Sequence, residues 1–302
     1  EPRLALKYNL TEKLRLKASA GLFSQNLIST NDETEVVSLF MGFLSSTTSI
    51  PDTFDGESVE SFLQKSIHYI LGLEYDILDN LNINMEFYFK DFNQLIGLNR
   101  NKIYEDIPEF SSTPDYLKTD FMVESGNAMG LDLLIKYNTK NISIWSTYSF
   151  GVVNKEDEFE IYHPHYDRRH NVNLVFSYLF GKKRTWEINT RWNYGTGFPF
   201  TRTQAYYEQI NFSDYNSSEF TVVNGQLGVI YSDLNDGRLP DYHRLDLSIK
   251  KKINLKNKTS LEVSLGVTNL YDRNNIFYYD RISAVRVDQL PIMPNIGFNW
   301  KF

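Results

Sequence analysis

The chain has 302 residues, of which 15% are aromatic, and its formal net charge is −7. This apolar and aromatic content is too high for a disordered chain, and the acidic balance argues against nucleic acid as a partner. No stretch approaches the roughly 18 consecutive apolar residues of a membrane-spanning helix. A mean hydropathy of −0.40 still allows a transmembrane β-barrel, because only every second residue of its strands faces lipid.

The N-terminal end shows no leader segment. The strand pattern begins directly after Glu1 and Pro2. Cysteine is absent, which fits an oxidising compartment but also many other proteins. We therefore expect either a mature product or a C-terminal piece of a longer chain.

Apolar and polar residues alternate along eleven short segments. The first two, residues 4–10 and 14–22, are joined by a short turn at Thr11 and Glu12. A period of two places alternate side chains on opposite faces of a strand, so each segment is a predicted β-strand. The other predicted strands are residues 67–75, 81–89, 129–137, 142–150, 172–180, 186–194, 245–253, 261–267 and 292–302.

The connections between these strands alternate between short and long. The later short turns are rich in Asn, Asp, Gly and Lys, and they are residues 79–80, 138–141, 181–184 and 256–258. The long connections are about residues 26–65 and 97–127, a mid-length loop through His163 and His165, and about residues 195–241 and 271–290. Short turns on one side and long loops on the other are typical of an outer-membrane barrel.

One face of each predicted strand is apolar and the other is polar. In residues 186–194, Trp186, Ile188 and Trp192 alternate with Glu187 and Arg191. The aromatic residues near strand ends, as in an interfacial girdle, are Tyr75, Tyr137, Tyr194 and Trp300. The opposite faces carry Arg15, Lys17, Glu86, Lys90, Asp132, Lys136, Asn173, Arg191, Arg244, Asp246, Lys250 and Glu262. These charges would be costly against lipid but are tolerated in a water-filled lumen.

The pattern therefore predicts an all-β fold, a transmembrane antiparallel β-barrel. Eleven is an odd number, whereas bacterial single-chain barrels use even numbers, and an open sheet in lipid would leave its edges unpaired. We expect further strands outside residues 1–302, and doubling eleven gives the 22 strands of plugged outer-membrane transporters. Two alternatives stay open: a passive or structural barrel without energy coupling, and a soluble all-β carbohydrate-binding module with its apolar face toward a core.

Several motifs are similar to segments of one known family. The most specific block combines His-Pro-His-Tyr-Asp-Arg-Arg-His at residues 163–170 with Trp-Asn-Tyr-Gly-Thr-Gly-Phe-Pro-Phe-Thr at residues 192–201. The other similar segments are residues 86–96, 126–148, 239–246, 267–272 and 297–302. Over nearly its whole length the chain resembles TonB-dependent outer-membrane receptors of the Bacteroidetes type.

The resemblance implies that residues 1–302 are the C-terminal portion of a 22-strand barrel in a Gram-negative outer membrane. It implies energy-coupled import of a scarce solute (a chelated metal, vitamin, glycan or peptide), with loops that bind and a plug that occludes. The implied partners are outer-membrane lipid, the plug and N-terminal barrel strands, the TonB system through that missing part, and a surface lipoprotein. No segment matches the plug or the TonB-contacting box, and no cofactor is expected.

The longest predicted loop contains four aromatic side chains and an arginine, namely Phe198, Phe200, Arg202, Tyr206 and Tyr207. Exposed rings beside an arginine can hold a sugar or an aromatic chelator, and long ordered loops often carry function. We predict a substrate-binding loop here. The alternative is that these side chains pack the loop against its neighbours.

Alternating aromatic residues end the chain at Phe298, Trp300 and Phe302. This ending resembles the barrel-insertion signal of outer-membrane proteins. The same residues also suit the lipid face of any transmembrane strand, and the two interpretations are compatible. Their terminal position favours the signal.

Three histidines, His163, His165 and His170, lie within eight residues, and two of them could ligate a metal. A solvated loop is favoured instead, so no metal site is predicted, and His170 is expected to orient the start of a strand. Residues 233–237 hint at a calcium loop, but their glycine comes one residue early, so a turn is favoured. No nucleophile elbow is present, and no enzymatic activity is expected.

Overall fold

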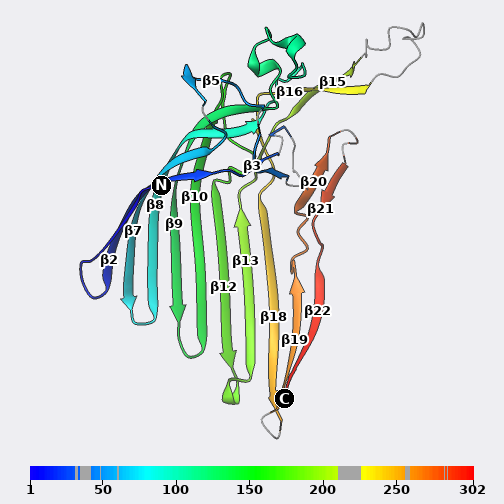
Figure 1. The fold of residues 1–302 in the computed structure, drawn as a ribbon. Coiled ribbons are helices and arrows are strands. Elements are labelled where there is room, and N and C mark those ends of the chain that lie inside the picture. Colours follow the sequence, from blue (N-terminus) through cyan, green and yellow to red (C-terminus); the bar gives the residue numbers. More distant parts are fainter. Residues whose placement is uncertain are drawn as a thin grey trace.

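The computed structural model describes residues 1–30, 33–34, 42–47, 49–59, 61–209, 226–255, 259–281, 283 and 285–302. Its main feature is one continuous antiparallel sheet in which eleven long strands lie side by side in chain order (Figure 1). These strands are β1 (Arg3–Asn9), β2 (Leu14–Gln25), β7 (Gln64–Leu78), β8 (Leu81–Leu98), β9 (Phe121–Asn138), β10 (Ile142–Glu156), β12 (His170–Phe180), β13 (Trp186–Gly195), β18 (Tyr242–Asn254), β19 (Ser260–Thr268) and β22 (Met293–Lys301).

The long connections all lie at one end of this sheet, which we call the loop end, and the short turns lie at the other (Figure 1). Where they are described, the long connections carry five small hairpins, β3–β4 (Ile28–Ser29, Phe43–Leu44), β5–β6 (Thr53–Phe54, Glu57–Ser58), β14–β17 (Pro199–Phe200, Gly237–Arg238), β15–β16 (Thr203–Gln209, Gln226–Tyr231) and β20–β21 (Ile276–Asp280, Val285–Asp288). A two-residue strand, β11 (Ile161–Tyr162), pairs with the end of β10. None of the described helices is long and apolar enough to span a membrane.

The eleven predicted strands and their short-then-long rhythm are confirmed, and the predicted turn at residues 256–258 lies outside the described residues. The predicted boundaries are too short at the loop end, where β8 and β9 each have 18 residues. There, residues 95–98 of β8 pair with residues 121–124 of β9 beyond a register shift between Phe92 and Leu95. A bulge inserts unpaired residues and breaks the period of two. In β9, residues 121–124 are all buried, so no alternation marks that part of the strand, and residues 121–127 belong to β9 rather than to a loop.

Apolar and polar side chains lie on opposite faces of the sheet, as predicted. Trp192 pairs with Leu245, and Ile188 pairs with Ile249, on the apolar face. This face is open, with Phe298 69% exposed and Leu71 61% exposed. The buried hydrophobic residues of the described chain lie instead at the loop end, and they are Ile28, Ile96, Phe121, Met122, Val123, Ala128, Tyr162 and Leu234. The apolar face therefore covers no core of its own, which is the arrangement that a bilayer completes.

Candidate functional site

At the loop end, a chain of buried charges begins at Arg100, just after β8. Its guanidinium donates to Asp157 at 2.6 Å and to Glu160 at 3.0 Å, both in the connection between β10 and β12. The Asp157 side chain is fully buried. A buried carboxylate is stable only when it is paired and hydrogen-bonded, so Arg100 ties two long connections together.

Glu124 occupies the centre of these charges. It lies in the apolar run Phe-Met-Val-Glu of β9, and it is 1% exposed. Its carboxylate accepts hydrogen bonds from the Tyr162 hydroxyl at 2.6 Å and from the Lys155 ammonium at 3.1 Å. Burial raises the pKa of Tyr162 above its ordinary value, although Lys155 opposes this, so the hydroxyl stays protonated and can donate.

Glu33, from the connection between β2 and β7, is the second carboxylate beside Lys155, at 3.4 Å. It accepts two hydrogen bonds of 2.8 Å from His165, one from the backbone N–H and one from the imidazole Nδ1. A third donor is the Asn235 side-chain amide at 3.2 Å. Burial opposes the ionisation of Glu33, but the His165 hydrogen bond and the Lys155 charge outweigh it and lower its pKa to about 2.

Backbone groups around Glu33 join the remaining long connections. The Thr201 hydroxyl lies 3.4 Å from the Glu33 carbonyl oxygen and accepts a 3.0 Å hydrogen bond from the Asn235 N–H. The Arg281 guanidinium, in the connection between β19 and β22, donates to the Thr34 carbonyl oxygen. All five long connections therefore meet in one set of contacts. We give the name loop network to seven of its ionisable members: Glu33, Arg100, Glu124, Lys155, Asp157, Tyr162 and His165.

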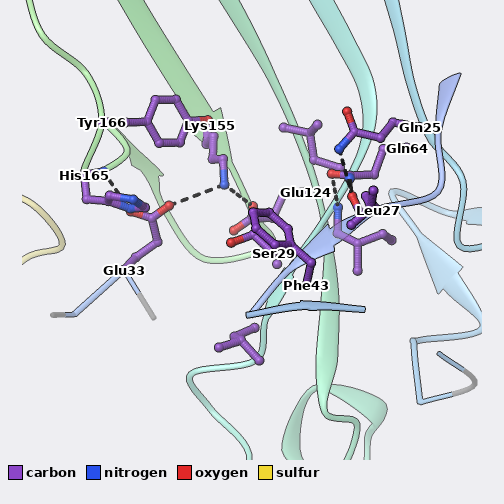
Figure 2. Close-up of a pocket in the computed structure, with 14 residues that line it drawn as sticks. Gln25, Leu27, Ser29, Glu33, Phe43, Gln64, Glu124, Lys155, His165 and Tyr166 are labelled. Atoms are coloured by element: carbon purple, nitrogen blue, oxygen red, sulfur yellow. Dashed lines mark hydrogen bonds and ion pairs between the residues drawn. The ribbon is translucent and has the colours of Figure 1, made fainter. Parts of the chain in front are cut away.

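A cavity of about 290 Å³ lies beside the loop network (Figure 2). Glu33, Lys155 and His165 form one side of it, as the dashed ion pairs and hydrogen bonds show. The rest of its lining is mixed apolar and polar, and includes Gln25, Leu27, Phe43, Gln64, Leu95, Ile96 and Leu98. Concave sites of this kind, with a few fixed polar groups, suit a small ligand.

The five predicted loop residues do not line this cavity. Phe198 lies under the Arg168 guanidinium, 4.0 Å from ring centroid to Cζ. Arg202 forms an ion pair with Asp236, and this hydrogen-bonded pair lowers the pKa of Asp236 to about 2. Phe198 therefore packs against the neighbouring connection, whereas Arg202 is exposed and pairs within its own loop, and the binding role of both stays a prediction.

The other predicted residues of this loop occupy its hairpins. Tyr206 and Tyr207 lie on β15 and are 44% and 48% exposed. The Tyr206 hydroxyl donates to the Arg281 carbonyl oxygen. Phe200 pairs with Gly237 between β14 and β17. The two exposed tyrosine rings remain available to a ligand, and their binding role stays a prediction.

The three histidines of the motif at residues 163–170 contact different groups. His163 contacts the Val153 carbonyl oxygen through Nδ1 and Arg169 through Nε2, whereas His165 contacts Glu33. His170 begins β12, and its Nδ1 lies 2.9 Å from the Tyr148 hydroxyl. In the described part of the chain, no group of three or more His, Asp or Glu side chains is arranged to hold a metal.

The same motif contains Asp167, whose side chain is buried and hydrogen-bonded. Its carboxylate accepts from the Val153 N–H at 2.9 Å and the Arg238 guanidinium at 2.7 Å. Arg169 pairs with it at 3.0 Å.

Residues 233–237, the possible calcium loop, lead into β17 and place Asp236 against Arg202. Gly197 lies so close to Leu239 that an added Cβ would overlap the Leu239 carbonyl oxygen.

Most of the loop network was missed by sequence reasoning, because its members are separated by up to 132 positions. The one available signal is Glu124, a lone carboxylate in an apolar run. Of the predicted insertion residues, Phe298, Trp300 and Phe302 are 69%, 65% and 103% exposed on or beside the edge strand β22. Their role in assembly stays a prediction.

The comparisons with known proteins agree with this architecture. A protein-family model described as TonB dependent receptor-like, beta-barrel, matches residues 1–270. None of the curated proteins matches the chain.

Solved structures of similar fold include the pyoverdine outer membrane receptor FpvA from Pseudomonas aeruginosa PAO1 bound to pyoverdine (13% identity, TM-score 0.59, 100% of this chain and 36% of that chain). The ferric-catecholate import receptor Fiu from K12 E. coli is 12% identical, with a TM-score of 0.60, over 98% of this chain and 34% of that chain. The ferric citrate transporter FecA in the unliganded form is 14% identical, with a TM-score of 0.57, over 99% and 38%. The chain spans about a third of the length of these proteins.

Proposed function

The chain belongs to the family of TonB-dependent receptor-like β-barrels, and from this membership we propose that it serves an outer-membrane receptor that imports a solute with energy coupled through TonB. An all-β barrel of this family lies in the outer membrane of Gram-negative cells, with its apolar face toward lipid. The alternative that the chain is a soluble carbohydrate-binding module is therefore wrong. The proposal involves capture and transport, with no chemical change to the solute.

The observation that carries the proposal is the convergence of all five long connections on the loop network. Glu33, Lys155 and Glu124 fix these connections over the polar face of the strands, beside a cavity of about 290 Å³. A passive pore has no need to hold its loops in one buried ionic set, whereas a receptor needs a preorganised binding surface. We infer that the loop end is extracellular and receives the solute.

The proposal also includes barrel strands outside residues 1–302. Among the described strands, β1 and β22 each pair with one neighbour only. Bare edges are very costly in lipid, which supports further strands beside both. We propose that residues 1–302 form the C-terminal portion of a 22-strand barrel, and that the plug, the TonB contact and the other strands lie in the rest of the receptor.

We propose that the solute is a scarce nutrient. The similar structures include a pyoverdine receptor, a ferric-catecholate import receptor and a ferric citrate transporter, which supports a chelated metal. The alternative solutes are a vitamin, a glycan or a peptide. The sequence motifs support a receptor of the Bacteroidetes type, for which a surface lipoprotein is a proposed partner.

The test is uptake by cells with and without a functional TonB system. We expect cells that carry the receptor to accumulate a labelled solute only when TonB is functional. Accumulation that is equal in both strains would establish the passive barrel instead. The variant Glu33→Gln should reduce accumulation, whereas Glu12→Gln, at the exposed β1–β2 turn, should not.

A further inference from the structure

Four cationic side chains gather at the end of the sheet where the short turns lie (Figure 1), although the chain as a whole carries a net charge of −7. Three of them, Lys182, Lys183 and Arg184, are exposed in the turn between β12 and β13. The fourth is Lys251 of β18, which pairs across the strands with Trp186 at the start of β13. We call these four residues the basic cluster.

The contacts of Lys251 hold its ammonium beside this turn. The ammonium donates a 3.1 Å hydrogen bond to the Thr185 hydroxyl, in the last residue before β13, and it lies 4.3 Å from the centroid of the Trp186 ring. The Trp186 ring lies against Gly181, because an added Cβ at that glycine would be 3.1 Å from the ring atom Cδ1. The turn and Lys251 therefore form one continuous surface.

Lys251 lies on the apolar face of the sheet. Its cross-strand neighbour is Trp186, and Ile188 pairs with Ile249 on the same face. Residues paired across adjacent strands share a face, so the ammonium lies on the side that meets lipid. A lysine is costly at the midplane of a bilayer but is tolerated near its interface. Because the turn lies directly beside it, Lys251 belongs to the end of the apolar face, where lipid headgroups begin.

The basic cluster lacks a carboxylate partner within the described residues, where none of its four side chains forms an ion pair. Glu187 pairs across the strands with Lys250, and Glu262 with Lys252, so these carboxylates lie on the opposite, polar face. An ammonium has three N–H donors, and the hydrogen bond of Lys251 goes to a neutral hydroxyl. Its charge and its other donors are therefore available to an anion that approaches from the membrane.

We propose that the basic cluster binds the headgroup of an anionic phospholipid. Its phosphate lies between Lys251 and the turn 182–184, and its acyl chains lie along the apolar face of β13 and β18. The charges are complementary, since each basic residue near a membrane surface attracts anionic lipid. A zwitterionic phospholipid carries the same phosphate together with an ammonium of its own, so it should bind more weakly.

The inference rests on the proposed function only for the choice of leaflet. With the loop end extracellular, the short turns are periplasmic, and the lipid belongs to the periplasmic leaflet of the outer membrane. The binding itself requires neither a solute nor energy coupling. A lipid-binding assay therefore tests it separately from transport.

The experiment uses the whole receptor purified in detergent and titrated with phosphatidylglycerol or phosphatidylethanolamine of identical acyl chains. Native mass spectrometry counts the lipids that the receptor retains. We expect the first phosphatidylglycerol to bind about tenfold more tightly than the first phosphatidylethanolamine, or better, because several cations face one anionic headgroup. Excess inorganic phosphate should not displace it, since the acyl chains contribute to binding as well.

Variants of the cluster test which residues carry this preference. Lys251→Gln should lower it about fivefold, the effect of one basic residue near a membrane surface, whereas Lys251→Arg should keep it. The control is Lys140→Gln, which removes the same charge from the exposed turn between β9 and β10 and should leave the preference unchanged.

Equal retention of the two lipids by the wild type, or an unchanged preference in Lys251→Gln, would overturn the proposal. So would an equal loss in Lys140→Gln, which would show a general attraction to this end of the barrel, or displacement by inorganic phosphate, which would indicate a free anion. If Lys251→Gln fails to assemble, the double variant Lys183→Gln/Arg184→Gln tests the exposed turn, and an undiminished preference there counts against the site. Loss of TonB-dependent uptake with a normal lipid preference would reject the proposed function and leave this inference standing.

Discussion

Glu33 and His165 are 132 positions apart in the chain, yet His165 donates two hydrogen bonds of 2.8 Å to one Glu33 carboxylate oxygen. One donor is the backbone N–H, so part of the contact depends on the path of the loop and not only on the imidazole. Because His165 belongs to the third long connection, Glu33 links the first long connection to the third, and Lys155 of β10 contacts the other carboxylate oxygen at 3.4 Å. This relationship makes Glu33 the position at which the loop network can be tested most directly.

Glu33→Gln should loosen the loop end while leaving the barrel assembled. The amide has no charge for Lys155 and accepts weaker hydrogen bonds from His165, and we expect a local loss of roughly 2 kcal/mol. Hydrogen exchange of residues 163–167 measures this loss. Glu109→Gln, at an exposed site on another loop, is the control. Unchanged exchange in Glu33→Gln would show that the carboxylate does not hold the loops.

Lowering the pH should break the contacts of the Glu33 carboxylate with His165 and Lys155. The pKa of Glu33 is about 2 in the folded chain against an ordinary value of 4.5. Its contribution, on the order of 3 kcal/mol, is therefore complete above pH 4.5 and lost as the pH falls through 2. Hydrogen exchange at the loop end, corrected for the intrinsic effect of pH, should show this loss in the wild type and a smaller one in Glu33→Gln. Equal profiles would contradict the assignment.

Gly197→Ala should displace the hairpin β14–β17. The added methyl group would overlap the Leu239 carbonyl oxygen, which is backbone and cannot rotate away. Overpacking of this kind costs about 1–3 kcal/mol. Thermal unfolding followed by circular dichroism measures the effect, with Gly72→Ala as the control because its added methyl group would meet only side-chain atoms of Glu86 and Lys17, at 3.3 Å and 3.4 Å. A melting temperature equal to that of Gly72→Ala would refute the predicted overlap.

Phe302→Gln should lower the amount of barrel assembled in the outer membrane. The side chain is fully exposed beside the edge strand β22, so its loss removes no packing within the described chain. A decrease in surface level therefore reports on recognition during insertion. Phe277→Gln changes another exposed phenylalanine, at the loop end, and should assemble normally. Normal surface levels of Phe302→Gln would count against the insertion signal.

Replacement of Tyr206 and Tyr207 by alanine should weaken solute uptake while sparing assembly. Both rings are exposed on β15, so the change removes two surfaces available to a solute, together with the hydrogen bond from the Tyr206 hydroxyl to the Arg281 carbonyl oxygen. Labelled-solute uptake, normalised to surface level, is the measurement. Tyr104→Ala, an exposed tyrosine on another loop, is the comparison. Uptake equal to the wild type would remove the hairpin from the binding site.

The candidate site was predictable only where its residues carry a local signal. Phe198, Phe200, Arg202, Tyr206 and Tyr207 stand out by composition, but the structure divides them between packing contacts and an exposed hairpin. Asp167 sits inside the most specific motif, and its burial beneath Arg238 follows from a contact 71 positions away. Such a partner cannot be chosen from sequence, because the chain offers many arginines at similar spacing.

The amino-acid sequence by itself determined the eleven strands, their apolar and polar faces and the alternation of short turns with long connections. Each of these features depends on neighbours two to four residues apart, and the period of a strand is a local property. Only the tertiary structure decided the bulge in β8 and the meeting of Glu33, Lys155 and Glu124. These depend on register and on loop closure, where a shift of one residue would turn every side chain to the opposite face.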